Sequence, residues 1–355
     1  MNVLMTADAV GGVWSYALDL ADGLSDLDVA VTLVVSGARL TAEQRAELRR
    51  SRVARCYASD FALEWQRDWT SVRRSGEWLR EIAETVEPDV VHVNGYVDAA
   101  LGWKQPVVVV AHSCVPSWFA AVRGQEAPAE WDRYRREVGR GLAAAELVVA
   151  PTRAMLSALQ RHHEVPSETR VIPNGIGPAV GPQVKRRVVL SAGRLWDEAK
   201  NVAGLARVAQ RVDAPVEVAG DLPTPRPEGV RALGRLDRND LRRRMAAAAV
   251  FCAPARYEPF GLGPLEAAHA GCALVLGDIP SLREVWGTAA TFVPPDDGEA
   301  LVAALNAALD DHAALGGLAR AHAGRYTSGR MAEAYADAYE RLVTQRLEPA
   351  GAVSA

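Results

Sequence analysis

The sequence lacks the features of a secreted, membrane-spanning or zinc-clustered protein. Its four cysteines are scattered through 355 residues without a CxxC pair, which argues against a disulfide framework and against a zinc site. No apolar run approaches the ~20 residues that a membrane-spanning helix needs. The first residues, MNVLMTADAVGG, carry no basic leader and are expected to form a strand rather than a signal peptide. We therefore expect a cytoplasmic protein with reduced thiols.

An excess of positive charge is also lacking. The net charge is −4, so the sequence predicts no nucleic-acid partner. What the chain does have is 49 % hydrophobic and 24 % charged residues, which is the mix of a soluble globular protein. At 355 residues it is too long for one ordinary core, and we expect two domains of roughly 170 residues each.

Short, almost continuously apolar runs alternate with longer amphipathic segments. Such runs are typical of parallel strands that are covered on both faces. Strands are expected at 2–7, 29–35, 89–95, 106–112, 147–152, 170–175, 188–193, 216–220, 230–234, 250–255, 273–278 and 291–295. Helices are expected at 13–24, 63–86, 128–144, 153–162, 201–211, 237–248, 263–270 and 298–310. The predicted fold class is α/β, with two tandem Rossmann-like, doubly wound domains that face a cleft.

The alternation is interrupted by GIGPAVGPQVKRR at 175–187. Its glycines and prolines place the domain boundary there, between a first domain at 1–180 and a second at 181–327. A further helix, expected at 328–346, follows no strand, so its apolar face needs a partner outside the ordinary sheet layers. The tail at 348–355 is expected to be loose.

Ligands of open parallel sheets bind beyond the carboxyl ends of the strands, so the first two such junctions are candidate sites. Gly11 and Gly12 follow the first strand and open a helix, where glycine amides can approach a phosphate or a sugar. The alternative is a plain tight turn, because no GxGxxG pattern is present. His112 ends another strand, and His92 and Asn94 have similar positions with less support. A lone histidine is otherwise more often structural.

Two junctions in the second half carry more charge. Arg194 and Lys200 follow Gly193 and flank a helix start, which suits a diphosphate. Asp197 and Glu198 could instead neutralise the pair and leave a solvated loop.

The last junction is EPFGLGPLE at 258–266. Gly261 and Gly263 permit a tight loop, and Pro264 fits the first turn of a helix. Glu258 is expected in the loop and Glu266 in the opening turn of the helix. A capped helix with two solvated acids is the alternative.

These motifs resemble a known family. EPFGLGPLE matches the Glu-x7-Glu motif of retaining GT-B glycosyltransferases, GRLWDEAKN at 193–201 matches their Arg…Lys loop, and PNGI at 173–176 is similar to the sequence before their interdomain linker. The nearest class is glycosyltransferase family 4. The resemblance is densest from 188 to 300 and thinnest from 40 to 85.

The resemblance implies a nucleotide-sugar donor, UDP- or GDP-linked, and no other cofactor. It assigns 1–180 to the acceptor, 181–327 to the donor, and the helix at 328–346 to a crossing back onto the first domain. The implied catalytic residues are Glu258, His112, Arg194 and Lys200, with His112 near the C6 hydroxyl of the donor sugar. The implied donor-binding residues are Gly12, Arg194, Lys200, Glu258, Phe260, Gly261, Leu262, Gly263 and Glu266, the last of these on the ribose hydroxyls.

The implied chemistry is transfer with retention of anomeric configuration. The leaving diphosphate gathers negative charge, which Arg194 and Lys200 can stabilise without a metal. No DxD-like pair stands at a strand end, so no metal is expected. Because no residue is a convincing nucleophile, we expect same-face attack in which the diphosphate takes the proton of the acceptor.

The acceptor and the alternatives stay open. A small molecule, a glycan and a lipid-linked acceptor all fit. The tryptophans and arginines at 60–80 predict either an acceptor wall or transient membrane contact, or an amphipathic helix with tryptophans in the core, which we favour. A non-catalytic nucleotide-sugar-binding protein, an NAD-dependent oxidoreductase, and a phosphorylase or epimerase of the same fold are the competing functions.

Overall fold

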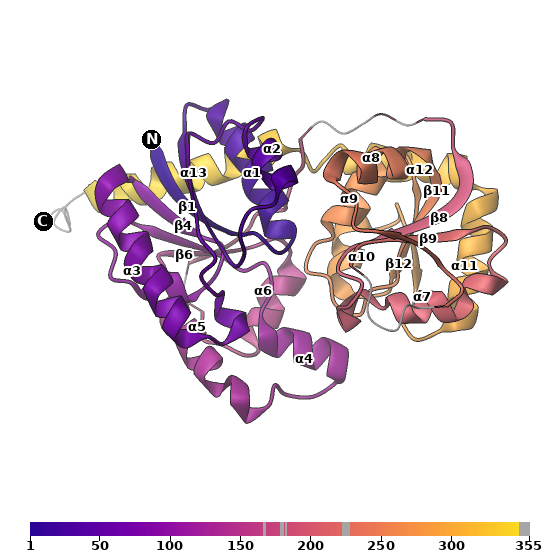
Figure 1. The fold of residues 1–355 in the computed structure, drawn as a ribbon, viewed down its shortest axis with the longest axis horizontal. Helices are drawn as coiled ribbons and strands as arrows, with labels where there is room; N and C mark the ends of the chain where they lie inside the picture. The colour runs from indigo at the N-terminus through magenta and orange to yellow at the C-terminus, as the bar shows by residue number, and fades with distance from the viewer. Residues whose placement is uncertain (166–167, 178–180, 182, 222–227, 348–355) are drawn as a thin grey trace, which may run out of the picture. The chain divides into compact units, whose positions relative to one another are not determined.

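The computed structural model describes residues 1–165, 168–177, 181, 183–221 and 228–347. The chain forms two compact units. Unit 1 comprises Met1–Ser117, Glu126–Gly177 and Ser328–Ala355, and unit 2 comprises Trp118–Gln125 and Pro178–Thr327 (Figure 1). The boundary expected at 180/181 falls beside residues 178–180, which lie outside the described residues, as does the tail at 348–355.

Unit 1 is built on a seven-stranded parallel sheet in the order β3-β2-β1-β4-β5-β6-β7. The strand order reverses between β1 and β4, which is the switch point of a doubly wound sheet. The strands are β1 Asn2–Asp8, β2 Ala30–Ser36, β3 Arg55–Ala58, β4 Val90–Val93, β5 Val107–Val110, β6 Leu147–Ala150 and β7 Thr169–Val171. The expected strands of this half are present, and β3 is an addition at the sheet edge.

Helices cover the sheet of unit 1. They are α1 Gly12–Ser25, α2 Ala42–Leu48, α3 Trp69–Val86, α5 Asp132–Ala144, α6 Arg153–Gln160 and α13 Ser328–Leu347, with 3-10 turns at Glu64–Gln66, Val97–Ala100 and Ala129–Trp131. The expected continuous helix at 63–86 was wrong. It is broken at Arg67, which has a φ of 64°, and α3 starts anew where the Asp68 side chain accepts a hydrogen bond from Ser71 N at 3.1 Å.

The tryptophans at 65, 69 and 78 are half-buried, so the expectation that they lie in the core was also wrong. The buried face of α3 is made instead by Val72, Leu79 and Ile82. Two of the neighbouring arginines cover aromatic rings: Arg133 lies 4.8 Å from the ring centre of Trp69, and Arg74 lies 5.8 Å from that of Phe61.

Unit 2 is built on a six-stranded parallel sheet in the order β10-β9-β8-β11-β12-β13, with its switch point between β8 and β11. The strands are β8 Arg186–Ala192, β9 Val216–Ala219, β10 Arg231–Gly234, β11 Ala248–Ala253, β12 Ala273–Gly277 and β13 Thr291–Val293. The helices are α7 Val202–Val208, α8 Arg238–Ala247, α9 Leu262–His269, α10 Pro280–Trp286, α11 Gly298–Asp310 and α12 His312–Ala323, with 3-10 turns at Glu198–Lys200 and Ala209–Arg211. Most of α4 (Val115–Arg123) also belongs to this unit.

The last helix, α13, belongs to unit 1 and packs against α1 (Figure 1). Its apolar face is buried, with Tyr335 and Tyr339 fully so. The approach is close at Gly23 of α1, where an added Cβ would lie 2.7 Å from Ser328 O and 2.8 Å from the Cβ of Ala332. The apolar face of this helix, which was expected to need a partner outside the sheet layers, therefore packs on α1.

Candidate functional site

The loop after β8 carries two of the predicted cations at the carboxyl end of the unit 2 sheet. Gly193 starts the loop, and its carbonyl passes so close to the end of β9 that a Cβ on Gly220 would lie 2.0 Å from it. At the far end of the loop Asn201 has a φ of 53° and donates to Pro254 O at 3.0 Å and to Pro295 O at 2.6 Å. These bonds fasten the loop to the segments that follow β11 and β13.

Lys200 and Glu258 form an ion pair at this edge. Nζ of Lys200 donates to Oε2 of Glu258 at 2.5 Å, and the two side chains are only 22 % and 18 % exposed. A backbone hydrogen bond of 2.8 Å from Arg256 N to Ala199 O holds the two loops together. The Lys200 charge is therefore preorganised at the strand ends rather than extended into solvent.

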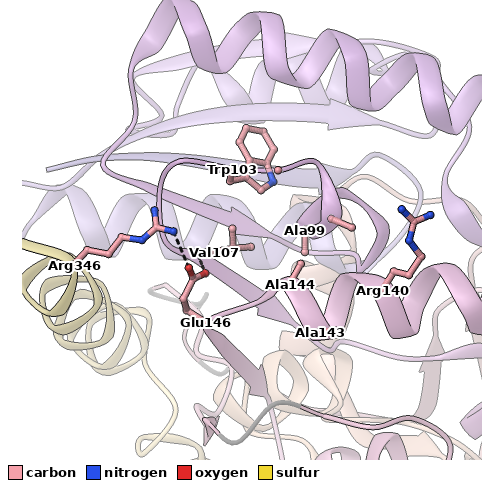
Figure 2. A pocket seen from close by; sticks show the side chains of 10 residues that line it. Ala99, Trp103, Val107, Arg140, Ala143, Ala144, Glu146 and Arg346 are labelled. Atoms are coloured by element: carbon pink, nitrogen blue, oxygen red, sulfur yellow. Dashed lines mark hydrogen bonds and ion pairs between the residues drawn. The ribbon is translucent and has the colours of Figure 1, made fainter. Parts of the chain in front are cut away.

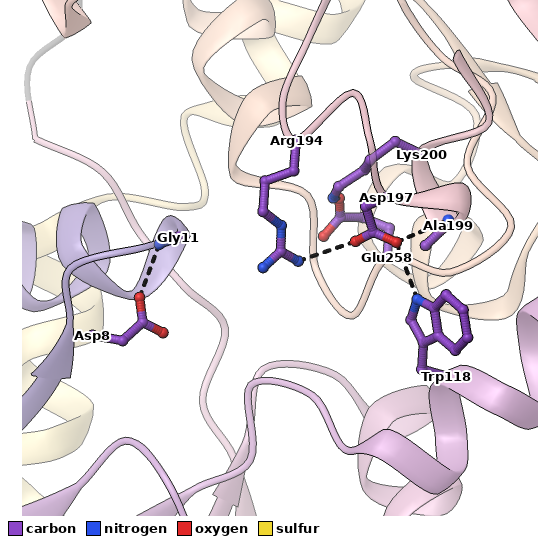
Figure 3. A network of polar contacts seen from close by, with 8 residues as sticks. All are labelled: Asp8, Gly11, Trp118, Arg194, Asp197, Ala199, Lys200 and Glu258. Atoms are coloured by element: carbon purple, nitrogen blue, oxygen red, sulfur yellow. Dashed lines mark hydrogen bonds and ion pairs between the residues drawn. The ribbon is translucent and has the colours of Figure 1, made fainter. Parts of the chain in front are cut away.

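Asp197 organises the other cation of the loop (Figure 3). Its Oδ2 accepts from Arg194 at 3.2 Å, and its Oδ1 accepts from Ala199 N at 3.0 Å and from the indole Nε1 of Trp118 at 3.1 Å. The Asp197 side chain is 8 % exposed, whereas Arg194 is 43 % exposed. Arg194 thus keeps an accessible guanidinium although one of its edges is held.

The acids of the loop do not cancel both cations. Asp197 pairs with Arg194, but Glu198 pairs with Arg123 of α4 at 2.6 Å. Lys200 pairs with Glu258, which lies outside this loop. The alternative of a self-neutralised loop therefore applies to Arg194 alone.

Glu266 does not lie where the sequence predicted. It is the fifth residue of α9 and lies past the opening turn, so the helix dipole is not its main partner. Its Oε1 accepts from Arg238 and from Arg242 of α8, each at 3.4 Å, and all three side chains are less than 20 % exposed. The two arginines hold this half-buried carboxylate in position.

The segment between Glu258 and Glu266 is a loop that leads through one left-handed residue, Gly261, into α9. Gly261 has a φ of 95°, and an added Cβ would lie 3.2 Å from Leu282 and 3.3 Å from Pro264, so glycine is required there. The Phe260 ring is buried and packs edge-on against Tyr326 at 5.6 Å. Phe260 can therefore reach a ligand only through its backbone, while Leu262 and Gly263 are partly exposed.

The glycine turn of unit 1 is already occupied by a carboxylate. Oδ1 of Asp8 accepts from Val10 N at 3.0 Å and from Gly11 N at 2.8 Å (Figure 3). Gly11 has an extended backbone with a φ of −140°, so it is not chosen for left-handed geometry. Gly12 is the exposed first residue of α1, which leaves it the better placed of the two glycines.

His112 lies beyond the end of β5 and is partly exposed. Its Nε2 makes a 2.7 Å hydrogen bond with Oδ1 of Asn94, and its ring lies edge-on to Tyr16 with ring centres 4.5 Å apart. Burial, and secondarily the neighbouring His92, lowers the pKa of His112 to about 3. The imidazole is therefore neutral at physiological pH and cannot act there as a cation.

Two further titratable groups lie near the end of β4, and sequence reasoning missed both. Oε2 of Glu64 accepts from Tyr96 N at 3.1 Å and from Val97 N at 2.9 Å. Burial raises the pKa of Glu64 to about 7 and that of Asp98 to about 6. Neither residue follows a predicted strand end directly, so no sequence signal singles them out.

A hollow of about 450 Å³ lies elsewhere in unit 1 (Figure 2). It is lined by Ala99, Ala100, Gly102, Trp103, Val107, Arg140, Ala143, Ala144, Glu146 and Arg346. Val107 starts β5 and Glu146 precedes β6, so the hollow is at the amino ends of these strands, opposite the predicted site. Glu146 is paired with Arg346 at 3.0 Å.

In the described part of the chain, no group of three or more His, Cys, Asp or Glu residues is arranged to hold a metal ion. No described helix is long and apolar enough to cross a membrane. All four cysteines are free.

Comparisons with known proteins give two family matches. Residues 10–180 match Glycosyltransferase Family 4, and residues 186–311 match Glycosyl transferases group 1. Among curated proteins, a glycogen synthase of Mycobacterium tuberculosis is 41 % identical over 100 residues, which are 28 % of this chain and 24 % of that protein. The chain therefore aligns with only about a quarter of that relative's length.

The fold is shared with solved structures over almost the whole chain. The sucrose-phosphate synthase of Thermosynechococcus elongatus has a TM-score of 0.78 at 18 % identity, covering 97 % of this chain and 100 % of that one. The Anabaena protein HepE, solved in complex with UDP and glucose, has a TM-score of 0.76 at 18 % identity, covering 96 % and 99 %. At this identity the likeness concerns the fold.

Proposed function

We propose that this chain is a glycosyltransferase, which moves a sugar from a nucleotide diphosphate sugar to a hydroxyl acceptor with retention of configuration. The matches of residues 10–180 to Glycosyltransferase Family 4 and of residues 186–311 to Glycosyl transferases group 1 support this proposal. The observation that carries this proposal is the half-buried Lys200–Glu258 pair beside an accessible Arg194 at the carboxyl end of the unit 2 sheet.

Arg194 and Lys200 bind the donor diphosphate and stabilise the charge that it gains as the sugar leaves. A fixed donor aimed at developing charge is typically worth ~3–4 kcal/mol. The anionic partners of these cations in the structure are Asp197 and Glu258. The diphosphate takes over these contacts, and the amides of the loop from Phe260 to Gly263 add further donors.

Glu266 accepts from the ribose hydroxyls, and Arg238 and Arg242 hold it in place for that contact. Gly12 lines the phosphates from the start of α1. His112 accepts from a hydroxyl of the donor sugar, because it is neutral and its Nε2 is already bonded.

Retention follows from same-face attack. Glu258 is bound to Lys200, which lowers its strength as a nucleophile, so a covalent intermediate on this carboxylate is not favoured. The acceptor hydroxyl attacks on the face that the diphosphate leaves, and the diphosphate takes its proton. We propose that no metal takes part, because the two cations supply the charge that a metal would bring.

The proposed donor is UDP- or GDP-linked, and UDP-glucose is the first to test because HepE, of the same fold, is solved with UDP and glucose. The acceptor is a small molecule, a glycan or a lipid-linked sugar. The aromatic and basic residues near α3 would make the contact with a membrane surface if the acceptor is lipid-linked. The four free cysteines favour the cytoplasm.

The proposal is tested by donor binding and transfer. In a thermal-shift panel of UDP-, GDP-, ADP- and TDP-sugars and NADH, one sugar nucleotide is expected to stabilise unit 2, since ligand at a hundred times its Kd adds about 2.7 kcal/mol. With that donor, Lys200→Ala and Glu258→Gln are each expected to lower the transfer rate at least about a hundredfold.

The matched control is Arg211→Ala, because Arg211 pairs with the exposed Glu299 in the same unit and has no place in the site. Its transfer rate is expected to stay within about twofold of wild type. Full activity of both site variants would contradict the assignment. Stabilisation by NADH alone would favour the oxidoreductase, and donor binding without transfer or slow donor hydrolysis would favour a sensor.

A further inference from the structure

A chain of hydrogen-bonded polar side chains leads from His112 to α13 within unit 1. Oδ1 of Asn94 lies 2.7 Å from Nε2 of His112 and 3.2 Å from Nε2 of His92. Nδ1 of His92 lies 2.6 Å from the hydroxyl of Tyr339 in α13. His92 is fully buried, whereas His112 is partly exposed.

The orientation of the Asn94 amide is fixed by β1. Asn94 Nδ2 donates to Thr6 O at 2.7 Å, and Asn94 N donates to Thr6 Oγ1 at 2.9 Å. Since a backbone carbonyl can only accept, the end of the amide that faces Thr6 must be the NH₂ group. The end that faces both imidazoles is therefore the oxygen.

This oxygen determines the proton positions on both rings. An amide oxygen accepts only, so each Nε2 at hydrogen-bond distance from it must carry a proton. A neutral imidazole carries one proton, which makes Nδ1 of His92 an acceptor for Tyr339. It also leaves Nδ1 of His112 unprotonated, with a lone pair that can accept a hydrogen bond. Burial lowers the pKa of His92 to about 4 and that of His112 to about 3, in keeping with two neutral rings.

We infer that Asn94 is a positioning residue that locks His112 in the Nε2–H tautomer, so that His112 offers a ligand a hydrogen-bond acceptor and selects a hydroxyl over a carboxylate at that contact. A ligand hydroxyl can donate a hydrogen bond to Nδ1. A carboxylate oxygen has no proton to donate, so its lone pairs would be repelled by the lone pair of Nδ1. The ligand part of this inference rests on the proposed function, and the tautomer part does not.

The tautomer is measured by ¹⁵N NMR of protein labelled at histidine, with His112 and His92 assigned from His112→Gln and His92→Gln. At pH 7 the expected result for His112 is a protonated Nε2 and a bare Nδ1. A proton on Nδ1, or a charged ring, in the wild-type protein would overturn the inference without any variant.

The role of Asn94 is tested by Asn94→Leu, which keeps a similar volume and removes the acceptor. His112 is then expected to leave the single Nε2–H form for a mixture of tautomers. The control is Thr6→Val, which removes only the Oγ1 acceptor and leaves the bond from Asn94 to Thr6 O, and the wild-type tautomer is expected. An unchanged His112 tautomer in Asn94→Leu would show that Asn94 does not set it.

The ligand part is tested by the affinities for UDP-glucose and UDP-glucuronate, which differ by a hydroxymethyl against a carboxylate. Wild type is expected to prefer the hydroxyl-bearing donor at least about tenfold, and Asn94→Leu is expected to lose most of that ratio. Equal wild-type affinities would overturn the selection of a hydroxyl. Failure of both donors to bind would count against the proposed function with these donors, while the NMR result would still decide the tautomer.

Discussion

At the scale of single residues, the sequence identifies side chains that follow strands but not those that hold them in place. Arg194, Lys200 and Glu258 were predicted because they follow apolar runs. Trp118 lies in a helix of unremarkable composition, and its bond to Asp197 depends on how a distant segment folds. Glu266 was expected in the opening turn of α9 but lies just past it. Its arginine partners come from α8, more than twenty residues away, so the motif alone does not indicate them.

Trp118 offers a prediction about the diphosphate loop. Trp118→Phe keeps the ring and removes the Nε1 donor that holds Oδ1 of Asp197. Asp197 is then expected to compete more strongly for Arg194, since one hydrogen bond that balanced its charge is gone. Nucleotide affinity, measured by calorimetry, is expected to fall about three- to tenfold.

The control for this prediction is Trp103→Phe in unit 1, whose indole donates to Asp98 O at 2.8 Å. Nucleotide affinity is expected to be unchanged in this variant. If Trp118→Phe binds nucleotide as tightly as wild type, Asp197 does not depend on the indole for its position.

At the scale of elements, the sequence predicts the strands more completely than the helices. The strands of the two sheets were predicted because their apolar runs are continuous, except for β3, whose four residues RCYA are only partly buried at the sheet edge. Four helices were not predicted: α2 and α10, of seven residues each, α4, of nine, and α12, of twelve. The break at Arg67 is followed by a capping bond that Ser71 N donates to the Asp68 side chain, and the apolar periodicity of the segment gives no sign of it.

The contact between α1 and α13 provides an element-scale prediction. Gly23→Ala raises helix propensity by ~1 kcal/mol, but its Cβ would lie 2.7 Å from Ser328 O and 2.8 Å from Ala332 Cβ. The backbone oxygen cannot move without displacing α13, so the net change is expected to be a destabilisation of about 1–3 kcal/mol. The urea midpoint of unfolding measures it.

The matched control is Gly139→Ala in α5, where an added Cβ meets nothing within 4 Å. Only the helix propensity changes in this variant, and the free energy of unfolding is expected to rise by up to about 1 kcal/mol. Equal midpoints for the two variants would mean that α13 can shift to accept the methyl group.

At the scale of the whole molecule, the two α/β units could be predicted from the alternation of apolar and amphipathic segments. The membership of residues 118–125 in unit 2 could not. These residues come between β5 and α5 of unit 1 in the chain, and within unit 2 Arg123 pairs with Glu198. The pH dependence of folding stability also belongs to this scale, because it is the sum of the contributions of titratable groups in different parts of the chain.

His92 makes stability fall on acidification. Burial holds its folded pKa at about 4, against an ordinary value of 6.5. Between these values the unfolded chain takes up a proton that the folded chain does not, so this contribution is complete above pH 6.5 and is lost as pH falls toward 4. The loss is expected to reach about 3 kcal/mol. Gln at position 92 does not titrate, so the stability advantage of wild type over His92→Gln is expected to shrink steadily from pH 7 to pH 4.

Glu64 gives the opposite sign and serves as the control. Its folded pKa is raised to about 7 from 4.5, so the protonated form is favoured by folding and stability is lost as pH rises through this window. Glu64→Gln keeps an oxygen for the amides of Tyr96 and Val97, and its stability relative to wild type is expected to rise from pH 5 to pH 8. Urea unfolding of the three proteins at each pH measures both trends. A difference between wild type and His92→Gln that stays constant with pH would mean that His92 is protonated in the folded protein as readily as in the unfolded chain, which its burial and its bonds to Tyr339 and Asn94 oppose.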